Sequence, residues 1–218
     1  MENIDKIVYT NTKRMTIKIE QNGEVVLKIP QNLKENAVEN FVSSKQDWIM
    51  KHKCKILARN RAYNDLITYK KISILGKVFD LKYNPQYKKP VLTDYELIVK
   101  DEKTLIKYLK TIAIDVLHKR IIELAKVVKS DNFEFKIDNS KVRWGSCSSM
   151  RVVKINFRVV MLECKLIDYV LIHELSHLKQ MNHSPAFWSE VSKVLPNYKT
   201  LRNELFNYDF LLQMYRVK

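Results

Sequence analysis

The stretch Ile167–His183, IDYVLIHELSHLKQMNH, holds three of the five histidines of this 218-residue chain. Its apolar first part favours a buried α-helix. Residues four apart lie on the same face of a helix, so His173 and His177 can point two imidazoles at one metal ion. Glu174 is rotated by about 100° around the helix axis, and it can therefore act on a water molecule at that metal.

A catalytic zinc site takes three protein ligands and keeps its fourth position open. His183 follows His177 after the residues LKQMN, where the helix can end, and Asn182 tolerates a left-handed turn that would bring the chain back. Ser184 and Pro185 are typical of the cap and the first position of another helix. Histidines also occur on ordinary helices, but imidazoles on an apolar helix are unfavourable to bury without a partner.

The pattern HExxH-x5-H therefore predicts a zinc site. The expected ligands are His173, His177 and His183. Glu174 is the expected catalytic base. Zinc-bound histidines also need acceptors for their second ring nitrogens, and Glu190 or Glu204 can serve as such acceptors.

The composition is that of a globular protein, with 46% apolar residues and no apolar run near the roughly 20 residues that span a bilayer. The N-terminal residues lack the apolar core of a secretory signal. The three cysteines, Cys54, Cys147 and Cys164, are scattered and form neither a disulfide framework nor a zinc clamp. A reducing, cytoplasmic environment is therefore expected.

The net charge is +15, from 39 basic against 24 acidic residues. Such an excess favours anionic partners such as nucleic acid, nucleotides or acidic proteins. Because lysine dominates and no dense basic cluster stands out, a biased composition explains the charge equally well.

Pattern changes divide the chain into a β-rich N-terminal region, 1–100, and a second domain, 101–218. The segment RMTIKIEQNGEVVLKIP alternates around Asn22-Gly23, which predicts a hairpin. One long helix is expected over about Leu33–Arg61, because its apolar residues recur with helical spacing. KISILGKVFDLKYN and YELIVK read as further strands.

In the second domain, Thr104–Lys129 is expected to form a long helix, followed by two strands or a strand pair. Three helices should follow, over about Leu166–Met181, Pro185–Leu195 and Lys199–Met214. Strands with helices segregated around them indicate an α+β fold rather than alternating βαβ units. The helix with His173 and His177 should pack on the small sheet.

The segment KVRWGSCS allows two interpretations. Arg143 can bind a substrate carboxylate or phosphate while Trp144 stacks on the substrate, and Gly145 can permit a close backbone approach. Alternatively, Trp144 belongs to the core and Gly145 forms a bulge. Cys147 lacks a neighbouring base and is expected to be a small buried residue. Tyr169 can stabilise a transition-state oxyanion, although packing is the simpler role.

VRWGSCSS, INFRVV, IDYVLIHELSHLKQMNHSPAFW and LPNY together resemble the YgjP-like family of zinc-dependent metallopeptidases. The resemblance runs over most of the chain and implies a zincin-like domain with the ligands and the base given above. The family is also similar to the SprT-like and WLM groups, some of which are DNA-linked proteases. Two departures are a missing proline near Cys164 and the residues Met150-Arg151 where glycine is common.

Three functions remain open at this point. The first is a zinc metallopeptidase, in which a strand such as INFRVV pairs with an extended substrate. The second is a metal-dependent nucleotide pyrophosphatase, for which the basic charge and Arg143 are the only arguments. The third is a nucleic-acid-associated protein with a structural zinc, for which a fourth ligand is missing from the sequence pattern.

Overall fold

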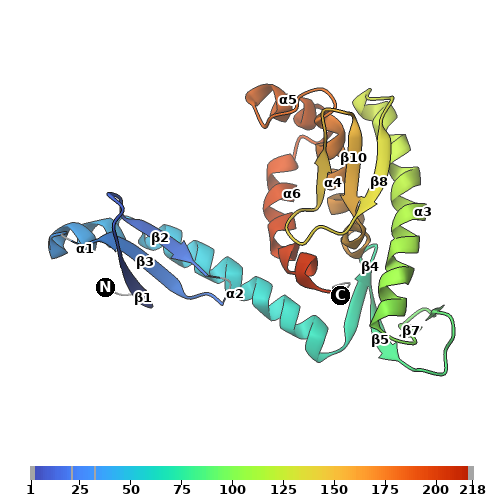
Figure 1. The fold of residues 1–218 in the computed structure, drawn as a ribbon, viewed down its shortest axis with the longest axis horizontal. Helices are drawn as coiled ribbons and strands as arrows, with labels where there is room; N and C mark the ends of the chain where they lie inside the picture. The colour runs from blue at the N-terminus through green and yellow to red at the C-terminus, as the bar shows by residue number, and fades with distance from the viewer. Residues whose placement is uncertain (1–2, 21, 32, 216–218) are drawn as a thin grey trace. The chain divides into compact units, whose positions relative to one another are not determined.

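The computed structural model describes residues 3–20, 22–31 and 33–215 (Figure 1). Contacts divide the chain into two compact units, Met1–Asn64 and Asp65–Lys218. Both units combine helices with small sheets, so the α+β prediction is confirmed. Within the described residues, no helix is both long enough and apolar enough to cross a membrane.

The first unit contains a three-stranded sheet in the order β1-β3-β2. Its strands are β1 (Lys6–Thr10), β2 (Thr16–Ile19) and β3 (Val25–Pro30). β1 runs parallel to β3, and β2 runs antiparallel to it. The predicted hairpin is confirmed: Gly23 has φ 90 and donates its N–H to the carbonyl of Glu20 at 2.9 Å. Asn22 contributes differently from the prediction, since its side chain accepts from the N–H of Glu24 at 3.0 Å.

The single helix expected after this sheet is two helices, α1 (Glu35–Ser43) and α2 (Gln46–Thr68). At the break the hydroxyl of Ser44 donates to the carbonyl of Phe41 at 2.7 Å, which competes with helical bonding. Trp48, expected in the buried stripe, is consequently 41% exposed. The helices and sheet share a small core formed by Val25, Leu27, Ile29, Val38, Val42 and Ile49.

The second unit begins with a four-stranded sheet in the order β4-β5-β7-β6. Its strands are β4 (Lys71–Ile74), β5 (Lys77–Tyr83), β6 (Val91–Leu92) and β7 (Glu96–Val99). Leu75 and Gly76 both have positive φ, 53 and 84, which is typical of a tight type I′ hairpin. Ile72 and Leu97 of this sheet are fully buried in the core of the second unit. The chain therefore divides into its two units between residues 64 and 65, and the domain boundary expected near residue 100 stays a prediction.

The helix α3 (Glu102–Val128) confirms the long helix predicted over Thr104–Lys129. Asp101 caps it by accepting from the N–H of Thr104 at 2.7 Å. Lys129 ends it in the left-handed conformation, with φ 54. One stripe of α3 lies in the main core: Leu105, Leu109, Ala113, Leu117 and Ile121 are all fully buried.

A second three-stranded sheet has the order β8-β10-β9. The strands are β8 (Glu134–Asp138), β9 (Gly145–Cys147) and β10 (Val152–Asn156). The prediction that INFRVV offers a free edge is wrong, because β10 is the central strand and the remaining residues form the 3-10 helix η1 (Phe157–Met161). The edge strands are β8 and β9, each of which pairs with β10 alone, and β9 is in contact with α4.

Four further helical segments follow: α4 (Cys164–Ser176), α5 (Pro185–Val194), α6 (Tyr198–Leu205) and η2 (Phe206–Gln213). α4 and α5 confirm two of the predicted helices. The third is divided, since its second half is a 3-10 helix.

The hairpin between β9 and β10 accounts for one departure from the family pattern. Arg151 has φ 60, a conformation that suits glycine, at the end of the loop where Ser148 donates to the carbonyl of Val152 at 3.1 Å. The Arg151 guanidinium donates to the carbonyls of Asn132 at 2.6 Å and Asp131 at 2.5 Å. These bonds offset the unfavourable backbone conformation.

The last described residues are tied to the segment between β8 and β9. Arg158 is fully buried and donates to the carbonyls of Met214 at 2.8 Å and Tyr215 at 2.9 Å. It also donates to the side-chain oxygen of Asn139 at 2.8 Å. We call this set of contacts the C-terminal brace.

The brace leads to a prediction about stability. Arg158→Met removes the donors and leaves buried acceptors unsatisfied, so the free energy of unfolding should fall by about 3 kcal/mol or more. Urea denaturation measures this change. Lys154→Met is the matched control, because Lys154 lies exposed on the neighbouring strand β10 and should change the value little. Equal effects of the two substitutions would contradict the brace.

Candidate metal centre

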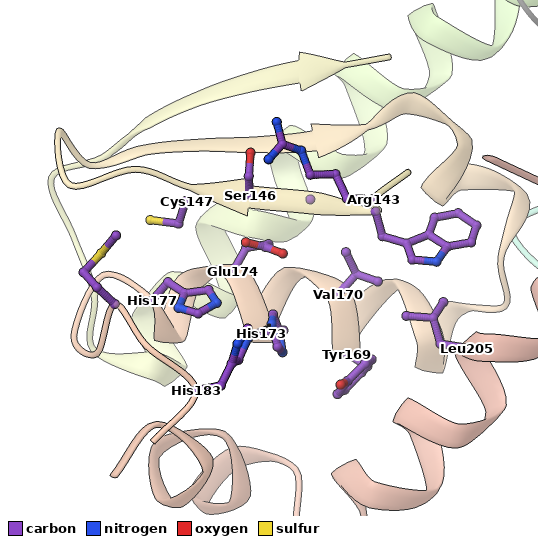
Figure 2. A pocket seen from close by; sticks show the side chains of 13 residues that line it. Arg143, Ser146, Cys147, Tyr169, Val170, His173, Glu174, His177, His183 and Leu205 are labelled. Atoms are coloured by element: carbon purple, nitrogen blue, oxygen red, sulfur yellow. Dashed lines mark hydrogen bonds between the residues drawn. The ribbon is translucent and has the colours of Figure 1, made fainter. Parts of the chain in front are cut away.

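The three histidines predicted as ligands come together in one cleft (Figure 2). His173 lies in α4, His177 caps its C-terminus, and His183 lies in the loop before α5. Each offers a ring nitrogen, and these nitrogens all lie within 4.8 Å of one another. The Nε2 atoms of His173 and His183 are 3.0 Å apart. Tetrahedral zinc with Zn–N bonds of about 2.0–2.1 Å would separate its nitrogens by about 3.3–3.4 Å, so the residues fit such an ion.

The imidazoles of His173 and His177 are held in the neutral form that metals bind. Burial, followed by the nearby His177 and His183, lowers the pKa of His173 to about 3. Burial also lowers the pKa of His177, and the carbonyl of Gln180 partly opposes this effect. Three neutral nitrogens are a donor set that suits zinc and other borderline transition metals.

The loop that carries His183 turns by a different route from the predicted one. Asn182 does not have a positive φ; instead its side chain accepts from the N–H of Ser184 at 3.3 Å. Ser184 and Pro185 do form the cap and first position of α5, since the Ser184 hydroxyl accepts from the N–H of Phe187 at 3.4 Å. Side-chain hydrogen bonds of Asn182 and Ser184 therefore stabilise the turn that leads into α5.

The predicted acceptors for the second ring nitrogens are wrong. Glu190 binds Lys179 and Lys193, and Glu204 binds Lys165 at 2.6 Å. The Nδ1 atom of His177 instead faces the carbonyl of Gln180 at 3.0 Å. The Nδ1 atom of His173 is buried and has no hydrogen-bond partner among the described residues.

Aromatic rings, rather than carboxylates, surround the histidines. Phe187 is fully buried and stacks on His177, with ring centroids 4.4 Å apart. Trp188 lies nearly parallel to the ring of His183 at 5.6 Å and an interplanar angle of 20°. The ring of Tyr198 stacks in turn on the ring of Trp188, with centroids 5.1 Å apart and an interplanar angle of 13°. The Arg202 guanidinium also lies over Trp188, 5.0 Å from its centroid.

Glu174 lies directly against the backbone of β9. A Cβ atom added to Gly145 would lie 2.6 Å from Cγ and 2.8 Å from Oε1 of Glu174, which no real contact tolerates. Gly145 is paired regularly with Ile155, so it permits a close approach and does not form a bulge. Burial raises the pKa of Glu174 to about 8, and the positive charge of Arg143 opposes this rise.

The remaining candidates lie on or beside β9. Arg143 is exposed at the cleft, whereas Trp144 packs in the core and donates its indole N–H to Asp209 at 2.9 Å. Cys147 is half-buried, and burial followed by the charge of Glu174 raises its pKa. The thiol is thus protonated, as expected for a residue that is not a nucleophile.

The cleft has a volume of about 450 Å³ between β9 and α4. Its wall includes residues that the sequence analysis did not single out: Ser146, Val170, Met181 and Leu205. No local motif marks them, because they come from four separate segments. The backbones of Trp144 and Ser148, on either side of β9, are hydrogen-bonded to β10. Because hydrogen-bonded residues alternate along an antiparallel strand, the N–H and C=O groups of Gly145 and Cys147 point away from β10.

The family model for YgjP-like proteins, the YgjP-like metallopeptidase domain, matches residues 13–208. The chain belongs to the YgjP-like family. The predicted resemblance is thereby confirmed, and family membership supports a metal-dependent peptidase. A search of curated proteins finds no significant match.

Two solved structures show a partial likeness to this YgjP-like chain. The metallopeptidase zymogen abylysin of Pyrococcus abyssi is 25% identical, with a TM-score of 0.40 over 43% of this chain and 94% of its own. The zymogen jannalysin of Methanocaldococcus jannaschii is 19% identical, with a TM-score of 0.39 over 42% of this chain and 95% of its own.

The contact between Gly145 and Glu174 can be tested by a double-mutant cycle. Gly145→Ala should lower the free energy of unfolding by about 1–3 kcal/mol, because the added methyl group overlaps the glutamate side chain. In a Glu174→Ala background the same substitution should have a much smaller effect. Thermal denaturation of the four proteins provides the measurement, and a coupling energy near zero would show that the two residues do not touch.

Proposed function

We propose that this YgjP-like protein is a zinc metallopeptidase with His173, His177 and His183 as ligands and Glu174 as catalytic base. The observation that carries the proposal is the convergence of three imidazoles beside a buried carboxylate in one cleft. Three protein ligands leave a position for water and substrate, as in catalytic rather than structural zinc sites. When bound, zinc supplies a Lewis acid that activates water and polarises the substrate carbonyl.

Glu174 handles the proton in this reaction. Its carboxylate accepts a proton from the attacking water and delivers it to the leaving nitrogen as the peptide C–N bond breaks. Gly145 and α4 hold the side chain where it can do so, because the carboxylate lies between them. The charge of Arg143 favours the ionised form of Glu174 that must act first.

The substrate is held by β9 in this proposal. The N–H and C=O groups of Gly145 and Cys147 point away from β10, so they can pair with the backbone of an extended peptide. The exposed guanidinium of Arg143 can bind an anionic group of the same substrate. Cys54, Cys147 and Cys164 are free, which accords with a cytoplasmic location.

The alternatives have less support. A pyrophosphatase rests on the net charge and Arg143 alone, whereas family membership favours a peptide bond. A structural zinc would need a fourth ligand, and the cluster of potential ligands in the described residues holds three histidines. Peptide cleavage is therefore the function to test first.

The role of the base predicts a separation of binding from catalysis. Glu174→Gln keeps the size of the side chain but removes its basicity, so kcat should fall by about 10²–10⁴-fold. Metal content, measured by mass spectrometry of the purified protein, should stay at one ion per chain. His173→Ala should instead lose the metal. Chelation should abolish cleavage of an unstructured protein such as casein, and zinc should restore it.

Hydrolysis of casein by Glu174→Gln at the wild-type rate would refute the proposed base. Hydrolysis of nucleoside triphosphates, in the same chelator-sensitive manner and without casein cleavage, would favour the pyrophosphatase instead.

The aromatic stack predicts a second effect on the metal. Trp188→Leu frees the ring of His183, so zinc affinity should fall by about 10–100-fold, the range seen when supporting residues of metal ligands are removed. Competition with a zinc-binding dye measures the affinity. Trp48→Leu is a matched control, because Trp48 stacks on His52 at 4.2 Å in the first unit. An equal loss in both variants, or no loss in Trp188→Leu, would contradict a role in holding His183.

A further inference from the structure

The two ends of the cleft differ in chemistry. One end is lined by Cys147, His177 and Met181, and the Met181 side chain is 51% exposed. The other end, beyond His173 and Glu174, is lined by a set of largely apolar side chains that we call the apolar end. Its members are Trp144, Tyr169, Val170 and Leu205. Figure 2 shows Tyr169, Val170 and Leu205 on the far side of Glu174 from His177.

The apolar end is rigid and offers little to a charged group. Its four side chains are between 2% and 9% exposed, and all belong to the main core cluster. The polar atom of Trp144 is already bound to Asp209, so the indole presents carbon to the cleft. Burial raises the pKa of Tyr169 to about 12, which keeps its hydroxyl neutral. An ionised side chain that entered this end would lose its water, and none of the four members would offer it an opposite charge.

The apolar end is also at the right distance from the proposed reaction. Tyr169 and Val170 precede His173 and Glu174 by one helical turn, a rise of about 6 Å along α4. An extended peptide advances about 3.3 Å per residue. In a peptide paired with β9, the residue beside the scissile bond is one such step away, and a bulky side chain on it can span the rest of the distance to the apolar end.

We propose that the apolar end is the specificity pocket of the enzyme and selects peptides with a bulky apolar side chain directly flanking the cleaved bond. This inference rests on the peptidase function proposed above. It names the substrate class: unfolded or extended segments rich in Leu or Phe, rather than acidic or basic peptides. The basic charge of the chain plays no part in this choice.

Internally quenched peptides that differ only at the two positions flanking the bond test the pocket, with Leu, Phe, Ala, Glu or Lys at each. At one of these positions, Leu or Phe should raise kcat/KM at least about tenfold over Ala and about a hundredfold over Glu. Mass spectrometry of the products assigns the bond that is cut. Similar values for all five residues at both positions would overturn the pocket.

A matched pair of variants locates the pocket. Leu205→Ala enlarges the apolar end. The ratio of kcat/KM for a peptide with Trp at the selected flanking position to that for a peptide with Leu there should therefore rise about tenfold over the wild-type ratio. Leu201→Ala makes the same change on the same helix, at a residue that is 4% exposed and does not line the cleft. Its ratio should equal that of the wild type, even though both variants lose stability. A ratio of two rates does not depend on the folded fraction, and equal shifts in both variants would contradict the assignment.

Failure of the pocket and failure of the enzyme give different results. If the protein cleaves peptides without regard to the flanking side chain, the pocket is wrong and the peptidase stands. If no peptide is cleaved by the zinc-loaded protein, or Glu174→Gln cleaves as well as the wild type, the proposed function itself fails. If Leu205→Ala does not fold, the ranking of peptides by the wild-type protein still decides.

Discussion

The close approach of β9 to α4 determines the shape of the cleft. This approach is possible because Gly145 has no side chain. Any Cβ at that position would overlap Glu174, so the strand would have to retreat or the carboxylate would have to turn. Because the carboxylate stays beneath the strand, it is largely removed from water, and its pKa rises. The same closeness places β9 along the cleft that holds the three imidazoles.

The ligands are supported by packing more than by hydrogen bonds. One carbonyl, that of Gln180, faces a histidine ring nitrogen, and the two carboxylates that were expected as acceptors, Glu190 and Glu204, are bound to lysines. Phe187 and Trp188 fill the space that such acceptors would occupy. Flat rings fix the orientation of an imidazole while leaving it neutral and in an apolar environment, which strengthens its bond to a cation. This YgjP-like site thus differs from the carboxylate-supported zinc site that its sequence was expected to have.

Local patterns in the sequence predicted the local parts of the structure. The hairpin at Gly23, the helix α3, and the spacing of His173 and His177 all follow from rules that operate within a few residues. Properties that depend on distant partners were missed. Nothing near β10 in the sequence reveals that β9 occupies the sheet edge, and nothing near Glu190 reveals its lysine partners. The break at Ser44 depends on one hydroxyl group that has other possible partners.

The apolar wall of the cleft was missed for a related reason. Val170 and Leu205 look like ordinary core residues in the sequence, and they are core residues in the structure as well. Only the arrangement of α4, α6 and the segment before β9 gives a small part of their surface to the cleft. A substrate pocket of this kind is lined by side chains at the margin of the hydrophobic core, so its lining is apolar like the core itself.

The C-terminal brace has a consequence for biosynthesis. Asp209 holds the indole of Trp144, and the carbonyls of Met214 and Tyr215 are bound by Arg158. Asp209, Met214 and Tyr215 follow the cleft-lining residues along the chain, so the ribosome adds them after the histidines and the glutamate. The cleft wall therefore reaches its final form late, when the rest of the second unit has already been translated.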